Sequence, residues 1–254
     1  DIDALTITPN VVATFDTGPV SHTVSLGADY DRTTEDGKLD LNFLAGQIDV
    51  RDPDYPEYAD PNFLLQDQRN RYTSEAIYLQ EQATLWGILH VVAGGRMTRI
   101  KTDTKIRPNG LGVTSTTTSS DDESEFTPRI GAVLDIAKEV SVFAGYGKGF
   151  QAPSGYVGLA APKPEKSEQI EAGIRFNLPT GLTGSLAVYQ LERENLPTVD
   201  PNTLATIQIG KDRARGIELD AIWQPLPGLS IIGNYAYTNA EIREGGTNQK
   251  GNTL

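Results

Sequence analysis

Residues 21–31 read SHTVSLGADYD and alternate between apolar and polar side chains. The even-numbered residues include Val24, Leu26 and Tyr30, whereas the odd-numbered residues are Ser, Thr, Gly and Asp. Successive side chains of a β-strand point to opposite faces, so only an extended chain sorts this stretch into one apolar and one polar face. The stretch therefore predicts a strand whose two faces meet different surroundings.

The same alternation returns along the whole chain, for example in residues 140–147 and 169–176. Strands of this kind with turn residues between them predict an all-β protein. We expect ten strands, at about residues 10–16, 21–31, 72–84, 88–100, 126–136, 139–149, 166–177, 182–194, 206–223 and 229–242.

The connections between these strands alternate strictly between short and long. Tight turns are expected at residues 17–20, 85–87, 136–138, 178–181 and 224–228, and long links at 32–71, 101–125, 150–165 and 195–205. A compact soluble domain rarely carries several structureless loops of about 20 residues. Strands of about ten residues with short turns at one end and long loops at the other are typical of a transmembrane antiparallel β-barrel.

Composition excludes several classes of protein. The chain has no Cys, so disulfide scaffolds, Cys-ligated metal centres and thiol nucleophiles are absent. Its formal net charge of −12 argues against binding to duplex nucleic acid. A soluble β-sandwich, used as an adhesin or binding module, stays an alternative to the barrel, although sandwich strands are usually shorter, with a mode of about five or six residues.

Five blocks of sequence resemble TonB-dependent siderophore receptors of the ferrichrome-receptor-like type. Residues 142–154, VFAGYGKGFQAPS, and 162–176, PKPEKSEQIEAGIRF, resemble the paired-strand signature of this family. Residues 75–96, 211–220 (KDRARGIELD) and 233–241 (GNYAYTNAE) resemble further strands of the same barrel, in the same order.

The resemblance implies a receptor in the outer membrane of a Gram-negative bacterium that imports ferric siderophores with energy from TonB. Such receptors are barrels of about 22 strands filled by an N-terminal plug domain. Residues 1–254 are then expected to form a partial barrel domain without the plug, the TonB box or the C-terminal strands. The implied partners are a ferric siderophore, TonB with ExbB and ExbD acting through the plug, and outer-membrane lipid and lipopolysaccharide. Iron would be carried as substrate, with no cofactor.

Other functions stay open within the same fold, because a cobalamin, a nickel chelate or an oligosaccharide could be the ligand. Enzyme activity is not expected, since no acid and base pair lies in the context of a closed, dry pocket. His22 and His90 lie on different predicted strands, so packing or a hydrogen bond is expected for each rather than metal binding.

Two groups of residues are candidates for function. Charged side chains on adjoining strands are expected to form a ladder that faces the lumen and the plug: Glu171, Arg175, Arg213, Arg215, Glu218 and Asp220. Side chains in the long links are expected to bind the ligand, unless these loops are merely solvated or contact lipopolysaccharide or cations: Tyr55, Tyr58, Phe63, Phe150, Gln151 and Tyr156. Acidic residues in the link 32–71 favour a neutral or cationic hydroxamate complex over an anionic catecholate. The glycines 145, 147 and 149 are expected where the plug backbone approaches the wall.

Overall fold

A computed structural model describes residues 1–41, 51, 53, 63–108, 115–152, 162–199 and 206–244. These residues form one antiparallel sheet. Its strands are β1 (Ile2–Ile7), β2 (Asn10–Thr17), β3 (Val20–Leu41), β4 (Phe63–Leu85), β5 (Leu89–Pro108), β6 (Thr117–Ala137), β7 (Val140–Gln151), β8 (Glu165–Asn177), β9 (Leu182–Val199), β10 (Thr206–Leu226) and β11 (Leu229–Glu244).

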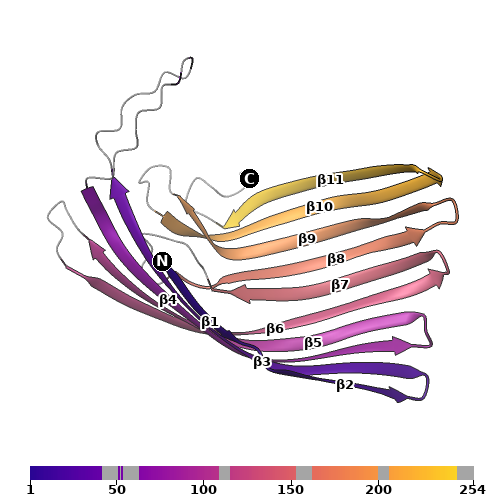
Figure 1. Cartoon of the computed structure of the whole chain (residues 1–254), viewed down its shortest axis with the longest axis horizontal. Coiled ribbons are helices and arrows are strands. Elements are labelled where there is room, and N and C mark those ends of the chain that lie inside the picture. The colour runs from indigo at the N-terminus through magenta and orange to yellow at the C-terminus, as the bar shows by residue number, and fades with distance from the viewer. Residues whose placement is uncertain are drawn as a thin grey trace.

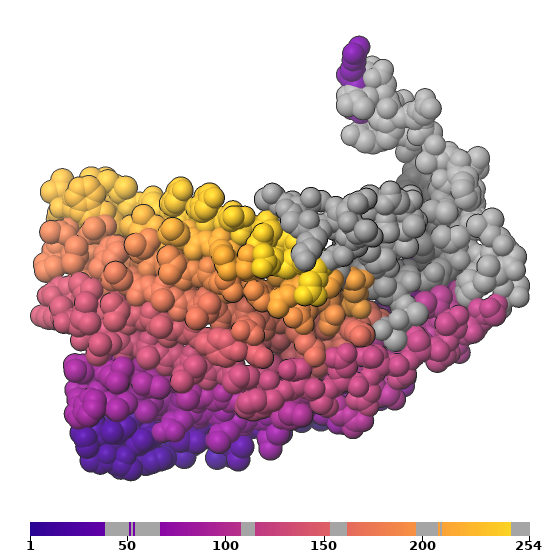
Figure 2. Space-filling view, turned by 180° about the vertical axis from the view of Figure 1, so that it is seen from behind, coloured from indigo at the N-terminus to yellow at the C-terminus, as the bar shows by residue number. Residues whose placement is uncertain are grey.

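The sheet is curved and open. From β3 to β11 each strand pairs with the next in the chain, so that the strands follow one another across the surface in chain order (Figures 1 and 2). The edges are β11 on one side and β1 with β2 on the other, and no strand pairs these edges with each other in the part of the chain that is described. The predicted antiparallel all-β fold is confirmed, and the described residues form an open, curved part of a barrel sheet.

The N-terminal edge contains a strand that the sequence reading missed. Ile7 lies opposite Tyr30 and Asn10 lies opposite Gly27, so β1 and β2 pair with β3 in one continuous register. Pro9 lies between them and has no N–H to donate to the ladder, which interrupts the strand without shifting it. The expected strand at 10–16 is therefore one half of a longer edge strand.

Several strands extend well into the predicted long links. β3 continues to Leu41 and β4 already begins at Phe63. Residues 32–38 and 66–71 of these strands are polar on both faces, so the alternation between apolar and polar side chains is lost there. Backbone pairing continues through these extensions, because Arg32 to Leu39 pair residue by residue with β4. The links 32–71 and 101–125 are thus shorter than expected. The short turns are confirmed, and Gly18 and Gly228 supply a positive φ in two of them.

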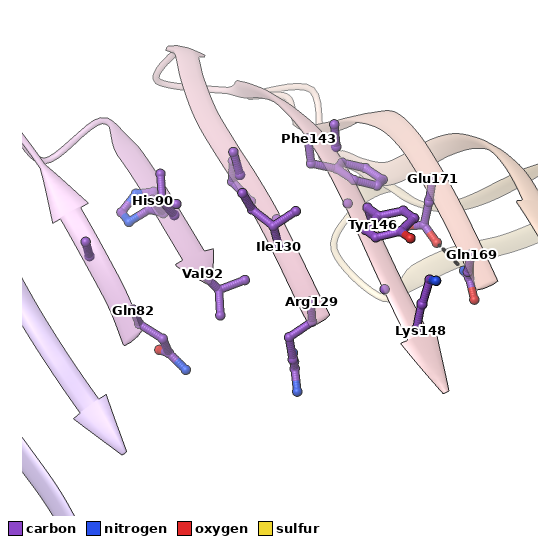
Figure 3. A pocket seen from close by; sticks show the side chains of 18 of the residues that line it. Gln82, His90, Val92, Arg129, Ile130, Phe143, Tyr146, Lys148, Gln169 and Glu171 are labelled. Carbon is purple, nitrogen blue, oxygen red and sulfur yellow. Dashed lines mark hydrogen bonds between the residues drawn. The ribbon is translucent and has the colours of Figure 1, made fainter. Parts of the chain in front are cut away.

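A large hollow identifies the concave side of the sheet. It has a volume of about 780 Å³ and is lined from five successive strands, β4 to β8, which can surround one hollow only where the sheet is concave (Figure 3). We call this side the inner face and the other the outer face. We also call the part of the sheet next to the tight turns the turn-side half, and the part next to the long connections the loop-side half.

The outer face of the turn-side half is a continuous apolar band. Its large apolar side chains are mostly about half exposed, among them Ile77, Leu79, Met97, Ile130, Ile170, Val188 and Ile217. A band of exposed apolar side chains across a whole sheet indicates contact with lipid. No helix in the described part of the chain is long and apolar enough to cross a bilayer.

Candidate functional site

The hollow on the inner face combines polar, charged and glycine positions. Gln82 and His90 lie on one side of it, Arg129 near its middle, and Phe143 and Glu171 on the other side (Figure 3). The guanidinium of Arg175 lies 5.3 Å from the centre of the Phe143 ring. Such a surface is polar enough to face water or another protein domain, and is unlike the apolar band behind it.

Four of the six charged residues expected in the lumen lie together on this inner face. Glu171 and Arg175 line the hollow. Arg175 lies opposite Ser185, which lies opposite Asp220, so these positions share one level across β8, β9 and β10. Glu218 is two residues from Asp220 and therefore points to the same side.

The expected lumen position is wrong for Arg213 and Arg215. Both are odd-numbered residues of β10, whereas Glu218 and Asp220 are even-numbered, and the register between β9 and β10 shows no shift between them. Strand alternation therefore puts both arginines on the outer face. There Arg213 pairs with Glu241, and Arg215 donates to Gln190 over 2.6 Å.

Many inner-face glycines make room for aromatic rings of the chain itself. A side-chain carbon at Gly27, Gly173 or Gly216 would collide with the ring of a tyrosine or phenylalanine on the neighbouring strand. By contrast, an added carbon at Gly145 or Gly147 would approach other atoms no closer than 3.9 Å. Glycine in a strand interior costs about 0.5–1 kcal/mol relative to alanine, and nothing in the described chain accounts for it at these two positions.

A hydrogen-bonded chain crosses the inner face near the turns. The His90 ring lies 3.1 Å from Thr84 Oγ1 and 3.3 Å from Asp135, which also accepts a bond of 2.6 Å from Ser141. Because the carboxylate lies between the histidine and the serine, the ring is not placed to take a proton from that serine. His22 on the outer face bonds Glu81 over 2.6 Å. Both histidines are therefore hydrogen-bonded, and no group of metal-ligating side chains forms among the described residues.

The loop-side half contains a buried polar cluster on its inner face that the alternation of apolar and polar residues does not predict. Gln68 donates to Asn70 over 2.8 Å, and Asn70 also accepts from Thr104 over 3.1 Å. Thr102 is wholly buried, and its hydroxyl has no hydrogen-bond partner. Asp121 lies directly opposite Thr102, and its Oδ2 atom also has none.

Burial raises the pKa of Asp121, and the neighbouring charge of Glu123 adds to the rise. The sequence shows only a run of acidic residues here. The burial of one of them follows from the neighbouring strand, which sequence periodicity does not reveal.

Two amide side chains hold the segment that leads into β8. Gln208 accepts from Lys163 N over 2.8 Å and donates to Lys163 O over 2.9 Å, as a neighbouring strand would. Asn195 donates to the carbonyl of the fully buried Pro164 over 2.8 Å. Residues 162–164 are therefore fixed against β9 and β10 on the inner side of the loop-side half.

The residues expected to bind ligand are only partly placed. Tyr55, Tyr58 and Tyr156 lie outside the described residues, and Phe63 is the first residue of β4 with a side chain that is also outside them. Phe150 lies on the outer-face register of β7, where the ammonium group of Lys166 is 5.6 Å from its ring centre. Gln151 is the exposed last residue of β7.

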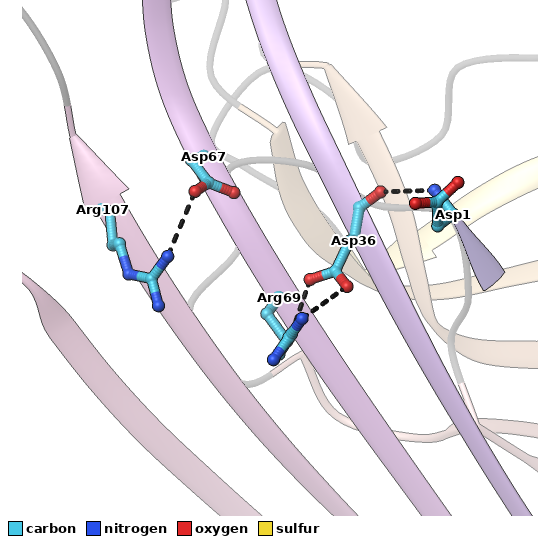
Figure 4. A network of polar contacts seen from close by, with 5 residues as sticks. All are labelled: Asp1, Asp36, Asp67, Arg69 and Arg107. Carbon is cyan, nitrogen blue, oxygen red and sulfur yellow. Dashed lines mark hydrogen bonds and ion pairs between the residues drawn. The ribbon is translucent and has the colours of Figure 1, made fainter. Parts of the chain in front are cut away.

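Ion pairs cover the outer face of the loop-side half. Asp36 accepts two bonds, of 2.6 and 2.7 Å, from Arg69, and its backbone oxygen accepts one from the N-terminal amine of Asp1 (Figure 4). Arg107 lies 3.3 Å from Asp67 nearby. This face is thus polar where it leaves the apolar band.

An open antiparallel arc with an apolar outer band, tight turns at one end and a polar inner face defines the wall of a membrane β-barrel. The model of the family TonB dependent receptor-like, beta-barrel matches residues 3–254, and the chain belongs to this family. The predicted family, the barrel fold and the location in the Gram-negative outer membrane are confirmed.

Known relatives agree with this assignment. The chain is 30% identical over 248 residues to the metal-pseudopaline receptor CntO of Pseudomonas aeruginosa, covering 94% of this chain and 34% of that protein. It is 29% identical to the ferrichrome outer membrane transporter/phage receptor of Escherichia coli, covering 94% and 32%. The structure of BauA, the ferric preacinetobactin receptor from Acinetobacter baumannii, superposes with a TM-score of 0.72 at 20% identity, covering 100% and 39%.

The chain therefore spans about a third of the length of the curated relatives it matches. Their names describe receptors and transporters rather than enzymes.

Proposed function

We propose that the chain forms part of the wall of a receptor that binds a metal–siderophore complex at the cell surface and imports it with energy from TonB. The observation that carries this proposal is the contrast between the two faces of one sheet, an apolar band outside and a polar, hollowed wall inside. A wall of this kind separates lipid from polar contents. The metal is the substrate, and the proposed protein is not an enzyme.

The names of the relatives support a metal–chelator complex as the ligand. One is a metal-pseudopaline receptor and another a ferrichrome transporter, so iron is one candidate metal among others. A cobalamin, a nickel chelate or an oligosaccharide is the alternative ligand within the same fold. The side chains proposed for ligand contact are Tyr55, Tyr58, Phe63, Gln151 and Tyr156, whereas Phe150 is left out because it lies on the outer-face register of β7.

The inner face supports contact with a plug domain that lies outside this chain. Glu171, Arg175, Glu218 and Asp220 offer charge on one side of the sheet. The open glycines at 145 and 147 leave room for backbone of another domain to lie against the wall. TonB, with ExbB and ExbD, would act through that plug.

The outer face supports contact with the anionic lipid of the outer leaflet. Arg32 and Arg71 both line two hollows, of about 290 and 390 Å³, just above the apolar band. Within the described residues neither guanidinium has an acidic partner. Unpaired guanidinium groups bind phosphate well, and the phosphates of lipopolysaccharide would lie at this level.

The proposal is tested in the complete receptor by replacing Glu171 and Arg175 together with glutamine. We expect radiolabelled metal complex to bind the cell surface normally on ice but to enter more slowly at growth temperature, because these side chains face the plug and not the mouth. The matched control replaces Arg213 and Arg215 on the outer face with glutamine and should import normally. The assignment of Glu171 and Arg175 to contact with the plug would be contradicted if the double variant lost surface binding but imported each bound complex at the normal rate. It would also be contradicted if the control variant imported as slowly as the inner-face variant.

A further inference from the structure

The two faces of the loop-side half carry different charges. Strand alternation assigns each charged side chain of this half to one face. The pairing registers from β3 to β6 and from β8 to β10 are continuous, apart from one shift between Leu39 and Asp40 at the end of β3. On the described strands, the inner-face cations in or next to this half are Arg193 and Arg96, and Arg96 pairs with Asp29. The acidic side chains of the inner face are Asp29, Asp31, Glu35, Asp121, Glu123, Glu125, Glu165 and Asp212.

The outer face of the same half holds the basic side chains, with acidic ones between them. The cations there are Arg32, Lys38, Arg69, Arg71, Arg99, Lys101, Lys105, Arg107, Lys148, Lys166, Lys211, Arg213 and Arg215. A molecule that enters along the inner face therefore meets more carboxylates than cations, and most cations of this half belong to the outer face.

The cations near the inner carboxylates are mostly committed to neighbours. Arg193 donates to Asp212 over 2.7 Å, and the Asp212 side chain is only 4% exposed. Lys166 contacts Glu125 at 2.9 Å and Glu123 at 3.4 Å, so its ammonium group lies beside these two inner carboxylates. Lys163 lowers the pKa of Asp121 without reversing the rise caused by burial.

Asp121 is an inner carboxylate with an oxygen that lacks a donor. The residue is partly exposed, while its Oδ2 atom is shielded from solvent and has no hydrogen-bond partner among the described residues, and the wholly buried hydroxyl of Thr102 directly opposite has none either. Oxygen atoms removed from water and left without a donor are unfavourable, and a cationic or N–H donor restores the missing interaction.

We propose that the substrate of this receptor is a metal complex that presents a cationic group, such as an ammonium, and that Asp121 receives this group on the inner wall. This inference rests on the proposed function and specifies its substrate. Opposite charges attract a cationic complex into the mouth, whereas a strongly anionic complex such as a triscatecholate is repelled.

Binding of three ferric complexes to the purified complete receptor tests the inference: a trihydroxamate with a free ammonium, a neutral cyclic trihydroxamate and an anionic triscatecholate. We expect the cationic complex to bind most tightly, with an affinity that falls as salt is raised. Replacing Asp121 with asparagine should weaken the cationic complex about five- to tenfold, since loss of one close charge pair is worth about 1 kcal/mol or more. The neutral complex should change about twofold or less.

The matched control is Asp122→Asn, which removes the same charge one residue away on the outer face. This variant should leave the order and the affinities of the three complexes unchanged. Tightest binding of the triscatecholate, or equal effects of Asp121→Asn and Asp122→Asn, would overturn the inference while the receptor function stands. If none of the three complexes binds but a cobalamin or an oligosaccharide does, the proposed substrate class itself is wrong.

Discussion

Asp121 and Asp122 are neighbours in β6, yet they lie in opposite surroundings. Asp122 on the outer face accepts bonds of 2.9 and 2.5 Å from Arg99, which hold its pKa below the usual range of a carboxyl. Asp121 on the inner face has a raised pKa, and its Oδ2 atom has no partner. The side of the strand on which a residue lies, rather than its place in a charged run, therefore decides what it can do.

The largest expected effect on stability comes from placing a charge in the apolar band of the outer face. Ile130 is 55% exposed, and strand alternation places its side chain on the outer face of β6 and that of Val133 on the inner face. Ile130→Arg in the complete receptor should destabilise the inserted barrel by about 2–4 kcal/mol, the cost of arginine near the bilayer midplane. Val133→Arg should cost much less, because its side chain can reach the polar interior. Folding yield into lipid vesicles measures both, and similar yields would remove the distinction between the faces.

A smaller difference in unfolding free energy is expected when an inner and an outer ion pair are each removed. Arg193→Met leaves the buried carboxylate of Asp212 without its guanidinium, and should cost about 1–3 kcal/mol. Arg69→Met removes two bonds to Asp36, of 2.6 and 2.7 Å, but both side chains are more than a third exposed, so a smaller loss of stability than for Arg193→Met is expected. Urea unfolding of the complete receptor in lipid gives the two free energies. A larger loss for Arg69→Met would show that the inner pair is solvated.

The alternation of apolar and polar residues predicts the strands of the sheet well. It does not predict which face a residue lies on where both faces are polar. Alternation along β8 predicts the inner face for Glu171 and Arg175, because apolar residues such as Ile170 and Ile174 form the other face of this strand. Arg213 and Arg215 precede the apolar part of β10, where no apolar face marks the alternation, and the predicted ladder therefore includes residues of both faces. Residues at similar positions along neighbouring strands can therefore lie on opposite faces of the sheet.

The buried pair of Asp121 and Thr102 could not be predicted from sequence for a different reason. Asp121 lies in the run SSDDESE, which predicts a solvated loop, and Thr102 lies in an equally polar stretch. Their burial depends on the register between β5 and β6 and on what packs over the inner face. Likewise, the bonds from Gln208 to Lys163 join residues 45 positions apart. Long-range pairing of this kind leaves no local pattern.

The smallest effect is expected for an exposed ion pair, and its pH dependence has a definite sign. Lys211 lies 2.8 Å from Glu192 and 3.3 Å from Glu194 on the outer face. The hydrogen bond from Lys211 lowers the pKa of Glu192 below 4.5. A carboxyl whose pKa is lower in the folded state contributes stability above its unfolded pKa, and this contribution is lost as the pH falls through the folded value. Lys211→Met should therefore lower stability at neutral pH by less than about 1 kcal/mol, and the difference from the native protein should vanish in acid.

Urea midpoints at neutral pH and at about pH 3 measure this difference, with Lys105→Met as the control because Lys105 has no acidic partner among the described residues. The pKa of Lys211 is itself raised by Glu192, but that contribution is lost only when the pH rises past the folded value, above 10.5, and so does not enter the acidic range. A gap between Lys211→Met and the native protein that stays the same in acid would mean that the lysine stabilises the fold through packing of its hydrocarbon chain rather than through its charge.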